Sequence, residues 1–194
     1  MKYFLSFVIL LFNSCAPTNS NIDTTSSTFQ IEVASLDTKE KQKIFLEEIY
    51  RMDQKVRTDE TAILQEFGND SKEHQAAWVT INKTDDDNLE KIELFLNRYG
   101  HPTLQDHGKK AVGAPWIVIH HTSKKGPRRR NFNYLYGAWK AGDLDGGRLA
   151  FYLNRMYARE NGGTRMVMKN PFTEDFEIDT LMEVMGLKDS VLME

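Results

Sequence analysis

One stretch of the chain constrains its fold more than any other, the run Gly113–Ser123 with the sequence GAPWIVIHHTS. It is the most apolar stretch that follows the N-terminal segment, so it has to be buried, and it ends in two adjacent histidines. Its apolar part, Trp116–Ile119, is too short for periodicity to separate a strand from a helix. We predict a helix, because Pro115 suits a first helical turn and no neighbouring stretch offers a pairing strand.

Helical spacing of apolar residues recurs through the rest of the chain. The predicted helices are 38–60, 71–81, 89–99, 132–139, 146–160 and 179–185, with Asp37 or Thr38 capping the first. The acidic run Asp85–Asn88 precedes a new apolar series, so we interpret it as the N-terminal cap of the third of these helices. The pattern predicts an all-α fold, a single compact domain of about six helices over residues 36–194.

The N-terminus reads as a lipoprotein signal. Residues 1–14 contain Lys2 and then an apolar run too short to cross a bilayer, since a transmembrane helix needs about 20 apolar residues. Cys15 stands where a bacterial lipoprotein carries its lipid, and the polar residues up to 35 resemble a flexible tether. We therefore expect a lipid-anchored protein of the bacterial cell envelope, facing the periplasm or the surface. The alternative is an ordinary cleaved signal peptide with an incidental thiol.

Composition narrows the classes of function. Cys15 is the only cysteine, so no intrachain disulfide holds the fold. Once the signal with Lys2 is removed, 24 basic residues face 28 acidic ones, a formal charge of -4. This balance argues against a general nucleic-acid-binding protein.

Two polar features call for an explanation. Asp53 and Arg57 lie one helical turn apart, and they form either an exposed ion pair or part of a buried cluster that faces His120 or His121. The two histidines are about 100° apart on a helix, so one should face the core and the other solvent. A histidine in this position is either a structural residue or a general base, and Asp53 is the carboxylate that could orient it.

Other candidate sites are weaker. The basic loop Lys124–Arg130 is either a solvated turn or a ligand for an anionic lipid headgroup or phosphate. Arg155 and Arg159 lie one turn apart on the predicted helix that begins near Asp145. The histidines lack the spacing of a zinc site, and the acidic runs lack that of a calcium loop, so no metal and no cofactor is expected.

The order of several motifs resembles a family of uncharacterised, all-helical bacterial proteins, a domain of unknown function found in secreted and lipoprotein contexts. The matching residues are Asp53, Gln54 and Arg57; Gly100, Pro102 and Thr103; Gly113 and His121; Tyr152, Leu153 and Arg155; and Gly186 with Leu187. The resemblance implies a helical fold and singles out Asp53, Arg57, His121 and Arg155, but it implies no activity.

This chain also departs from the family pattern. His101, His120 and Asn154 replace a tryptophan, a glutamine and an aspartate of the family, and 164–168 replaces a polar segment. If those residues form a site in the family, this chain has a reduced version of it.

Two hypotheses of function follow. In the first, a polar pocket holds a small anionic ligand. Gln54, Arg57 and Arg155 bind the ligand in that pocket, and Asp53 orients His121, which could act as a catalytic base. In the second, the chain is a non-enzymatic structural or interaction lipoprotein. Its polar cluster only specifies helix packing, and an envelope protein binds the basic loop or the aromatic helix 132–139.

Overall fold

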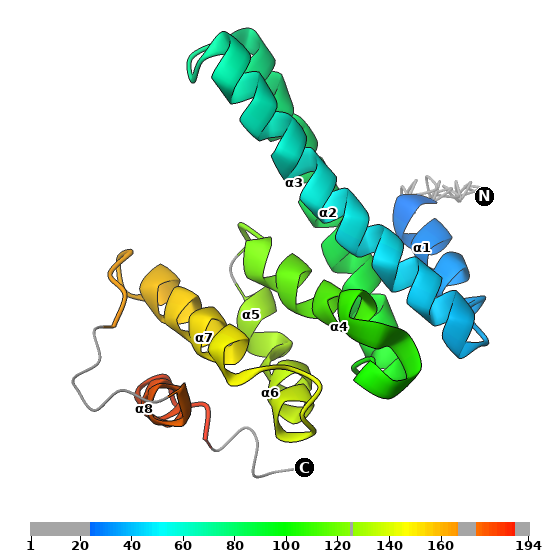
Figure 1. Ribbon diagram of the computed structural model, residues 1–194, viewed down its shortest axis with the longest axis vertical. Coiled ribbons are helices and arrows are strands. Elements are labelled where there is room, and N and C mark those ends of the chain that lie inside the picture. The colour runs from blue at the N-terminus through cyan, green and yellow to red at the C-terminus, as the bar shows by residue number, and fades with distance from the viewer. Residues whose placement is uncertain (1–23, 125, 167–173, 189–194) are drawn as a thin grey trace, which may run out of the picture.

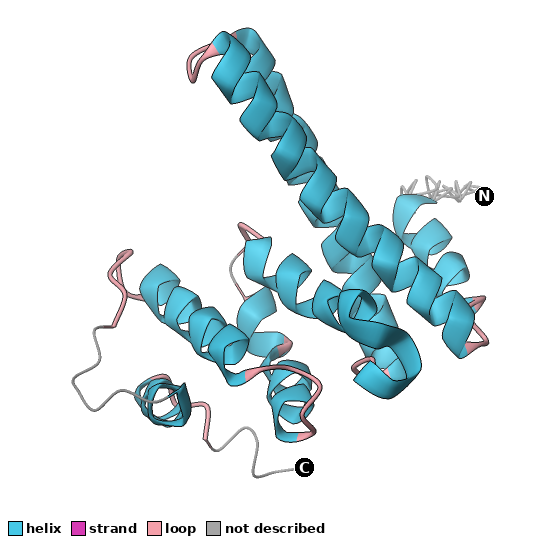
Figure 2. Cartoon of the chain, viewed as in Figure 1, coloured by secondary structure: helices cyan, strands magenta, loops and turns pink. Residues whose placement is uncertain are grey.

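The computed structural model describes residues 24–124, 126–166 and 174–188, and every regular element in these ranges is a helix. The predicted signal peptide, Cys15 and the first part of the predicted tether lie outside the described residues. The helices are α1 (Thr24–Ala34), α2 (Lys39–Phe67), α3 (Lys72–Tyr99), α4 (Leu104–His121), α5 (Pro127–Arg130), α6 (Phe132–Lys140), α7 (Gly146–Glu160) and α8 (Glu174–Val184). The all-α prediction is confirmed (Figures 1 and 2).

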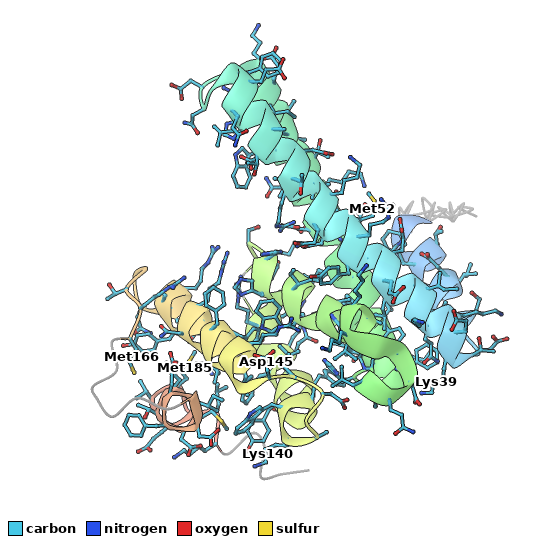
Figure 3. The ribbon with its side chains drawn as sticks, in the orientation of Figure 1. Lys39, Met52, Lys140, Asp145, Met166 and Met185 are labelled. Carbon is cyan, nitrogen blue, oxygen red and sulfur yellow. The ribbon has the colours of Figure 1, made fainter. Side chains whose placement is uncertain are left out.

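The long antiparallel hairpin of α2 and α3 dominates the shape of the molecule (Figure 1). Thr38 begins α2 by accepting a hydrogen bond from the Lys41 amide, and Ser71 begins α3 in the same way through the His74 amide. Gly68, with φ 85°, ends α2 in a conformation that favours glycine. The outer half of the hairpin extends away from the other helices, and many of its side chains project outward, although His74 and Ile81 are buried (Figure 3).

The core lies where the inner half of the hairpin meets α4, and it continues through α6, α7 and α8. α4 packs against α2 on one side and α7 on the other, so the apolar side chains of 113–119 are buried from both sides. Side chains of α4 and α7 fill the space between these two helices in Figure 3. The C-terminal end of α4, with both histidines, therefore lies between the hairpin and α7.

Three sequence predictions differ from the structure. The stretch predicted as two helices with a cap at Asp85–Asn88 is the single helix α3, because its interior contains no glycine or proline. The acidic run is accommodated inside the helix by three cations: Asp85 pairs with Arg57, Asp86 with Lys124 and Asp87 with Lys83.

The other two differences concern helix starts. α4 begins at Leu104 and bends at Gly108, so Pro115 lies inside it and not in its first turn. The predicted flexible tether to residue 35 is a helix from Thr24, and Val33 and Leu36 pack into the core. Burying these two side chains stabilises a segment whose polar composition suggested disorder.

Among the helices of the described ranges, none combines the length and apolarity that crossing a bilayer requires.

Candidate functional site

Asp53 is the centre of a buried polar network. It lies on the face of α2 that packs against α4, and its side chain is only 1% exposed. The carboxylate accepts hydrogen bonds from Gln54 Nε2 at 2.8 Å and from His121 Nδ1 at 3.0 Å, and Arg57 Nη1 lies 3.2 Å away. Of the two interpretations of the Asp53–Arg57 pair, the structure therefore shows the buried cluster.

Arg57 links Asp53 to α3. Its Nη2 donates to both carboxylate oxygens of Asp85, at 2.8 and 3.0 Å, and its Nη1 also donates to the Asp53 backbone oxygen at 3.0 Å. Burial raises the pKa of Asp85, and the neighbouring Arg57 opposes that rise. Sequence reasoning missed Asp85, because an acidic run is also a common helix cap.

His121 is held so that one ring nitrogen stays available. The carboxylate of Asp53 can only accept a hydrogen bond, so neutral His121 carries its proton on Nδ1. Its Nε2 has no hydrogen-bond partner among the described residues, and the side chain is 19% exposed. An imidazole oriented by a buried carboxylate, with its second nitrogen unprotonated and accessible, is the geometry of a general base.

His120 is buried in the core, which confirms the prediction that one of the two histidines faces the core. Its ring stacks on Trp116, with centroids 5.0 Å apart and planes within 6°, and it also contacts Phe151. Burial first, and then the charge of Arg155, lower the pKa of His120 to about 3, so the ring is neutral. Arg155 Nη1 donates to Nε2 at 3.2 Å, which leaves the proton on a buried Nδ1 without a partner.

Arg155 is the cation nearest to this end of α4 from the α7 side. Its guanidinium donates a hydrogen bond to the neutral imidazole of His120, and it has no carboxylate partner among the residues that the structure describes. Burial and the nearby Arg159 lower its pKa. Asp53, Gln54, Arg57 and His121 thus form one network, and Arg155 reaches the same helix end through His120.

The basic loop is a turn with paired charges. Part of it is the short helix α5, and Lys125 lies outside the described residues. Lys124 pairs with Asp86 at 2.9 Å, Arg129 with Glu160 at 2.8 Å, and Arg130 with Glu93 at 2.6 Å. Arg128 is different: it is buried and donates to the His120 and Thr122 backbone oxygens at 2.7 and 2.6 Å. It therefore caps the last carbonyls of α4, a role that the sequence did not indicate.

Within the described part of the chain, no three His, Cys, Asp or Glu side chains gather closely enough to hold a metal ion. The aspartates before α7 have structural roles: Asp145 caps α7, and Asp143 accepts a hydrogen bond from the Leu104 amide.

Comparison with protein-family models, curated proteins and solved structures gives no match to this chain. The resemblance based on motif order therefore stays a prediction, and the site has to be judged by its own chemistry.

Proposed function

We propose that this protein binds a small anionic ligand at the C-terminal end of α4. The observation that carries the proposal is His121, held through Nδ1 by buried Asp53 at 3.0 Å while its Nε2 has no hydrogen-bond partner among the described residues. Arg155, which has no carboxylate partner in the described ranges, reaches this helix end from α7. The imidazole of His121 and the guanidinium of Arg155 both lie against His120, and a pair of such groups suits a carboxylate or phosphate ligand.

Each residue of the network has a distinct part in this proposal. Arg155 supplies the charge that attracts the ligand, and His121 takes up a second proton as the anion binds, so that Nε2–H donates a hydrogen bond to it. Asp53 is a positioning residue that fixes the imidazole, and Gln54 and Arg57 hold Asp53. Because Arg57 is already bound by two carboxylates, its contribution to ligand binding is secondary. If the protein is an enzyme, His121 Nε2 would take a proton from water or a hydroxyl group in a hydrolytic or transfer reaction.

The ligand site would belong to a lipid-anchored protein of the bacterial envelope, facing the periplasm or the surface. The basis is the N-terminal sequence, with its short apolar segment and Cys15. Incorporation of labelled palmitate in a bacterial host should occur in the wild type and be absent in Cys15→Ala. Equal labelling of both proteins would contradict the anchor and favour an incidental thiol.

Thermal unfolding tests the ligand site directly, because a ligand that binds only the native state raises Tm. We expect small carboxylates or phosphates to stabilise the wild type by about 2.7 kcal/mol at a hundredfold excess over Kd. His121→Gln and Arg155→Gln should lose this response. The matched control is Arg51→Gln, which removes an exposed arginine paired with Glu48 and should keep it. A wild-type Tm that does not move at high ligand concentration would count against the proposal.

The second candidate is an interaction protein in which the network serves only helix packing. The basic loop and the helix 132–139 offer little surface for this purpose, since the described loop charges other than Arg128 are paired and Phe132 and Leu135 are buried. The α2–α3 hairpin is a better surface, because Phe67 and Val79 are 48% and 70% exposed. Recovery of an envelope partner that is lost in Phe67→Ser and Val79→Ser, with ligand response unchanged, would favour this candidate.

A further inference from the structure

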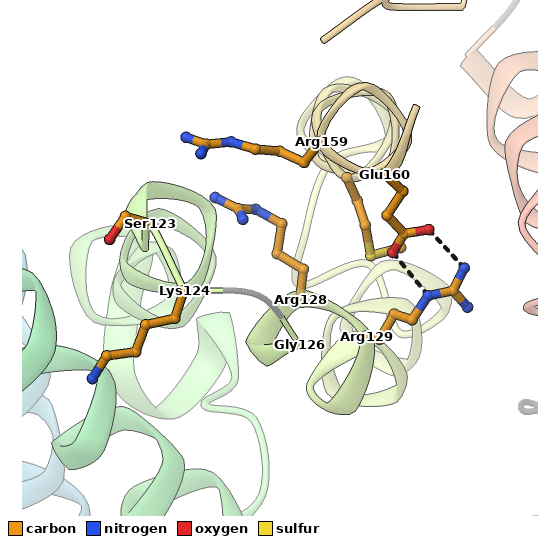
Figure 4. Close-up of a pocket in the computed structure, with 8 residues that line it drawn as sticks. Ser123, Lys124, Gly126, Arg128, Arg129, Arg159 and Glu160 are labelled. Atoms are coloured by element: carbon orange, nitrogen blue, oxygen red, sulfur yellow. Dashed lines mark hydrogen bonds and ion pairs between the residues drawn. The ribbon is translucent and has the colours of Figure 1, made fainter. Parts of the chain in front are cut away.

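A pocket of about 410 Å³ lies between the loop after α4 and the C-terminal end of α7. Four cationic side chains and one carboxylate line it, together with Ser123, Gly126 and Met156; the charged residues are Lys124, Arg128, Arg129, Arg159 and Glu160. In Figure 4 the side chains of Arg128 and Arg159 extend side by side in the same direction, while Arg129 and Glu160 pair on the opposite side of α7. The pocket is therefore strongly cationic.

Ion pairs neutralise only half of these cations. Arg129 binds both oxygens of Glu160 at 2.8 Å, so the one carboxylate of the lining is fully engaged, and Lys124 pairs with Asp86 at 2.9 Å. Arg128 and Arg159 have no carboxylate partner among the residues in the described ranges. Two guanidinium groups without a counter-ion, next to each other, form a site that favours an anion.

Arg128 shows that this site is built into the fold. Its side chain is only 5% exposed, and its Nε is buried without a hydrogen-bond partner. The two carbonyls at the end of α4 accept from Nη2 and compensate part of the charge. Burial, and then the charges of Arg159 and Arg155, lower its pKa to about 10, so the positive charge remains incompletely balanced. A buried charge of this kind is costly unless another partner completes its shell.

Arg155 is a third cation close to this pocket. Arg155 precedes Arg159 by one turn on α7, and like charges at this spacing destabilise a helix. An anion bound between α5 and α7 would turn this repulsion into attraction for all three arginines.

We infer that this pocket binds the phosphoryl group of a phosphomonoester, with Arg128 and Arg159 as its direct ligands and Arg155 as a neighbouring positive charge. One guanidinium can satisfy a carboxylate, whereas a phosphoryl group offers three oxygens and a charge of about -1.5 to -2. Two or three converging guanidinium groups therefore match a phosphoryl group. The inference rests on the proposed function, because it names the class of anion that the end of α4 attracts. The phosphoryl group belongs either to a soluble metabolite or to a lipid headgroup.

Isothermal titration of the full chain in a non-ionic detergent tests the inference. The probes are glycerol 3-phosphate, phosphatidic acid dispersed in the same detergent, and acetate. We expect glycerol 3-phosphate or phosphatidic acid to bind more tightly than acetate. Tighter binding of the first indicates a soluble source, and tighter binding of the second indicates a lipid source. Binding of acetate as tight as that of both phosphates, or no phosphate binding at all, would overturn the inference.

Arg159→Gln is the decisive variant, because Arg159 is exposed and its loss should leave the fold intact. Losing one charge-assisted contact should raise Kd about tenfold or more. Arg51→Gln removes an exposed arginine elsewhere and should leave Kd unchanged. Unchanged phosphate binding in Arg159→Gln would overturn the phosphoryl site.

His121→Gln separates the two proposals. Phosphate binding lost in Arg159→Gln and kept in His121→Gln would support the phosphoryl site and contradict the role of His121. The reverse pattern would overturn the phosphoryl site and support the proposed function.

Discussion

Replacing Asp53 by asparagine removes one charge from the network that joins α2, α3 and α4, with almost no change in shape. The carboxylate is 1% exposed and contacts donors of Gln54, Arg57 and His121. Asparagine keeps one acceptor oxygen and presents an amide to the remaining donors. Removing one partner of a buried ion pair costs about 3–5 kcal/mol. Because Arg57 is 25% exposed and keeps Asp85, we expect the lower end of this range, about 3 kcal/mol.

Urea unfolding followed by circular dichroism measures this loss as a lower midpoint with an unchanged slope. Asp59→Asn is the matched control, since it makes the same substitution on the same helix. Asp59 pairs with Lys55, and the side chains of Lys55 and Asp59 are 54% and 52% exposed. We expect the control to lose less than about 0.5 kcal/mol. An Asp53→Asn protein as stable as the wild type would refute the structural reasoning, and it would mean that Asp53 is retained for function at the expense of stability.

Two further predictions concern α4. The pKa of His120 is about 3 in the folded protein and near 6.5 in the unfolded chain. The unfolded chain therefore binds more protons at acidic pH, and the free energy of unfolding should fall on acidification from about pH 6.5 to 5. His120→Phe should reduce that slope and leave the part due to His101 and His107, because burial also lowers the pKa of each, that of His101 to about 4. An unchanged slope would mean that His120 does not contribute to it. Gly113→Ala should raise the free energy of unfolding by about 0.5–1 kcal/mol, because helical glycine is costly and a Cβ there meets Tyr50 at an ordinary 3.5 Å. A lower urea midpoint would show that α4 has no room for the methyl group.

Local signals predicted much of the fold. Thr38, one of the two caps proposed for the first long helix, does cap α2, and α7 begins at Gly146, close to the predicted start near Asp145, because helix starts depend on a few neighbouring residues. The continuity of α3 was missed for the opposite reason. Asp85 is stabilised inside the helix by Arg57, 28 residues earlier, and nothing in the local sequence announces such a pair.

The candidate site shows the same limit. Asp53 and His121 are 68 residues apart, and a contact of Asp53 with His120 or His121 was only one of two alternatives, based on the rule that charges in a helical core need partners. The rule gave the type of partner but not the distance or the ring nitrogen. Arg128 was assigned to a basic turn, because its role depends on where the last carbonyls of α4 point, which only the packed structure fixes.

The ligand site depends on the orientation of His121, which long-range proton–nitrogen NMR of its labelled ring measures. Neutral His121 should carry its proton on Nδ1, and glycerol 3-phosphate or acetate should shift the Nε2 signal. His74 at the hairpin tip, whose ring bonds to Asn69 and Glu60, should not respond. A proton on Nε2, or a His121 spectrum unchanged by both ligands, would contradict the claim that Asp53 prepares this histidine to meet an anion.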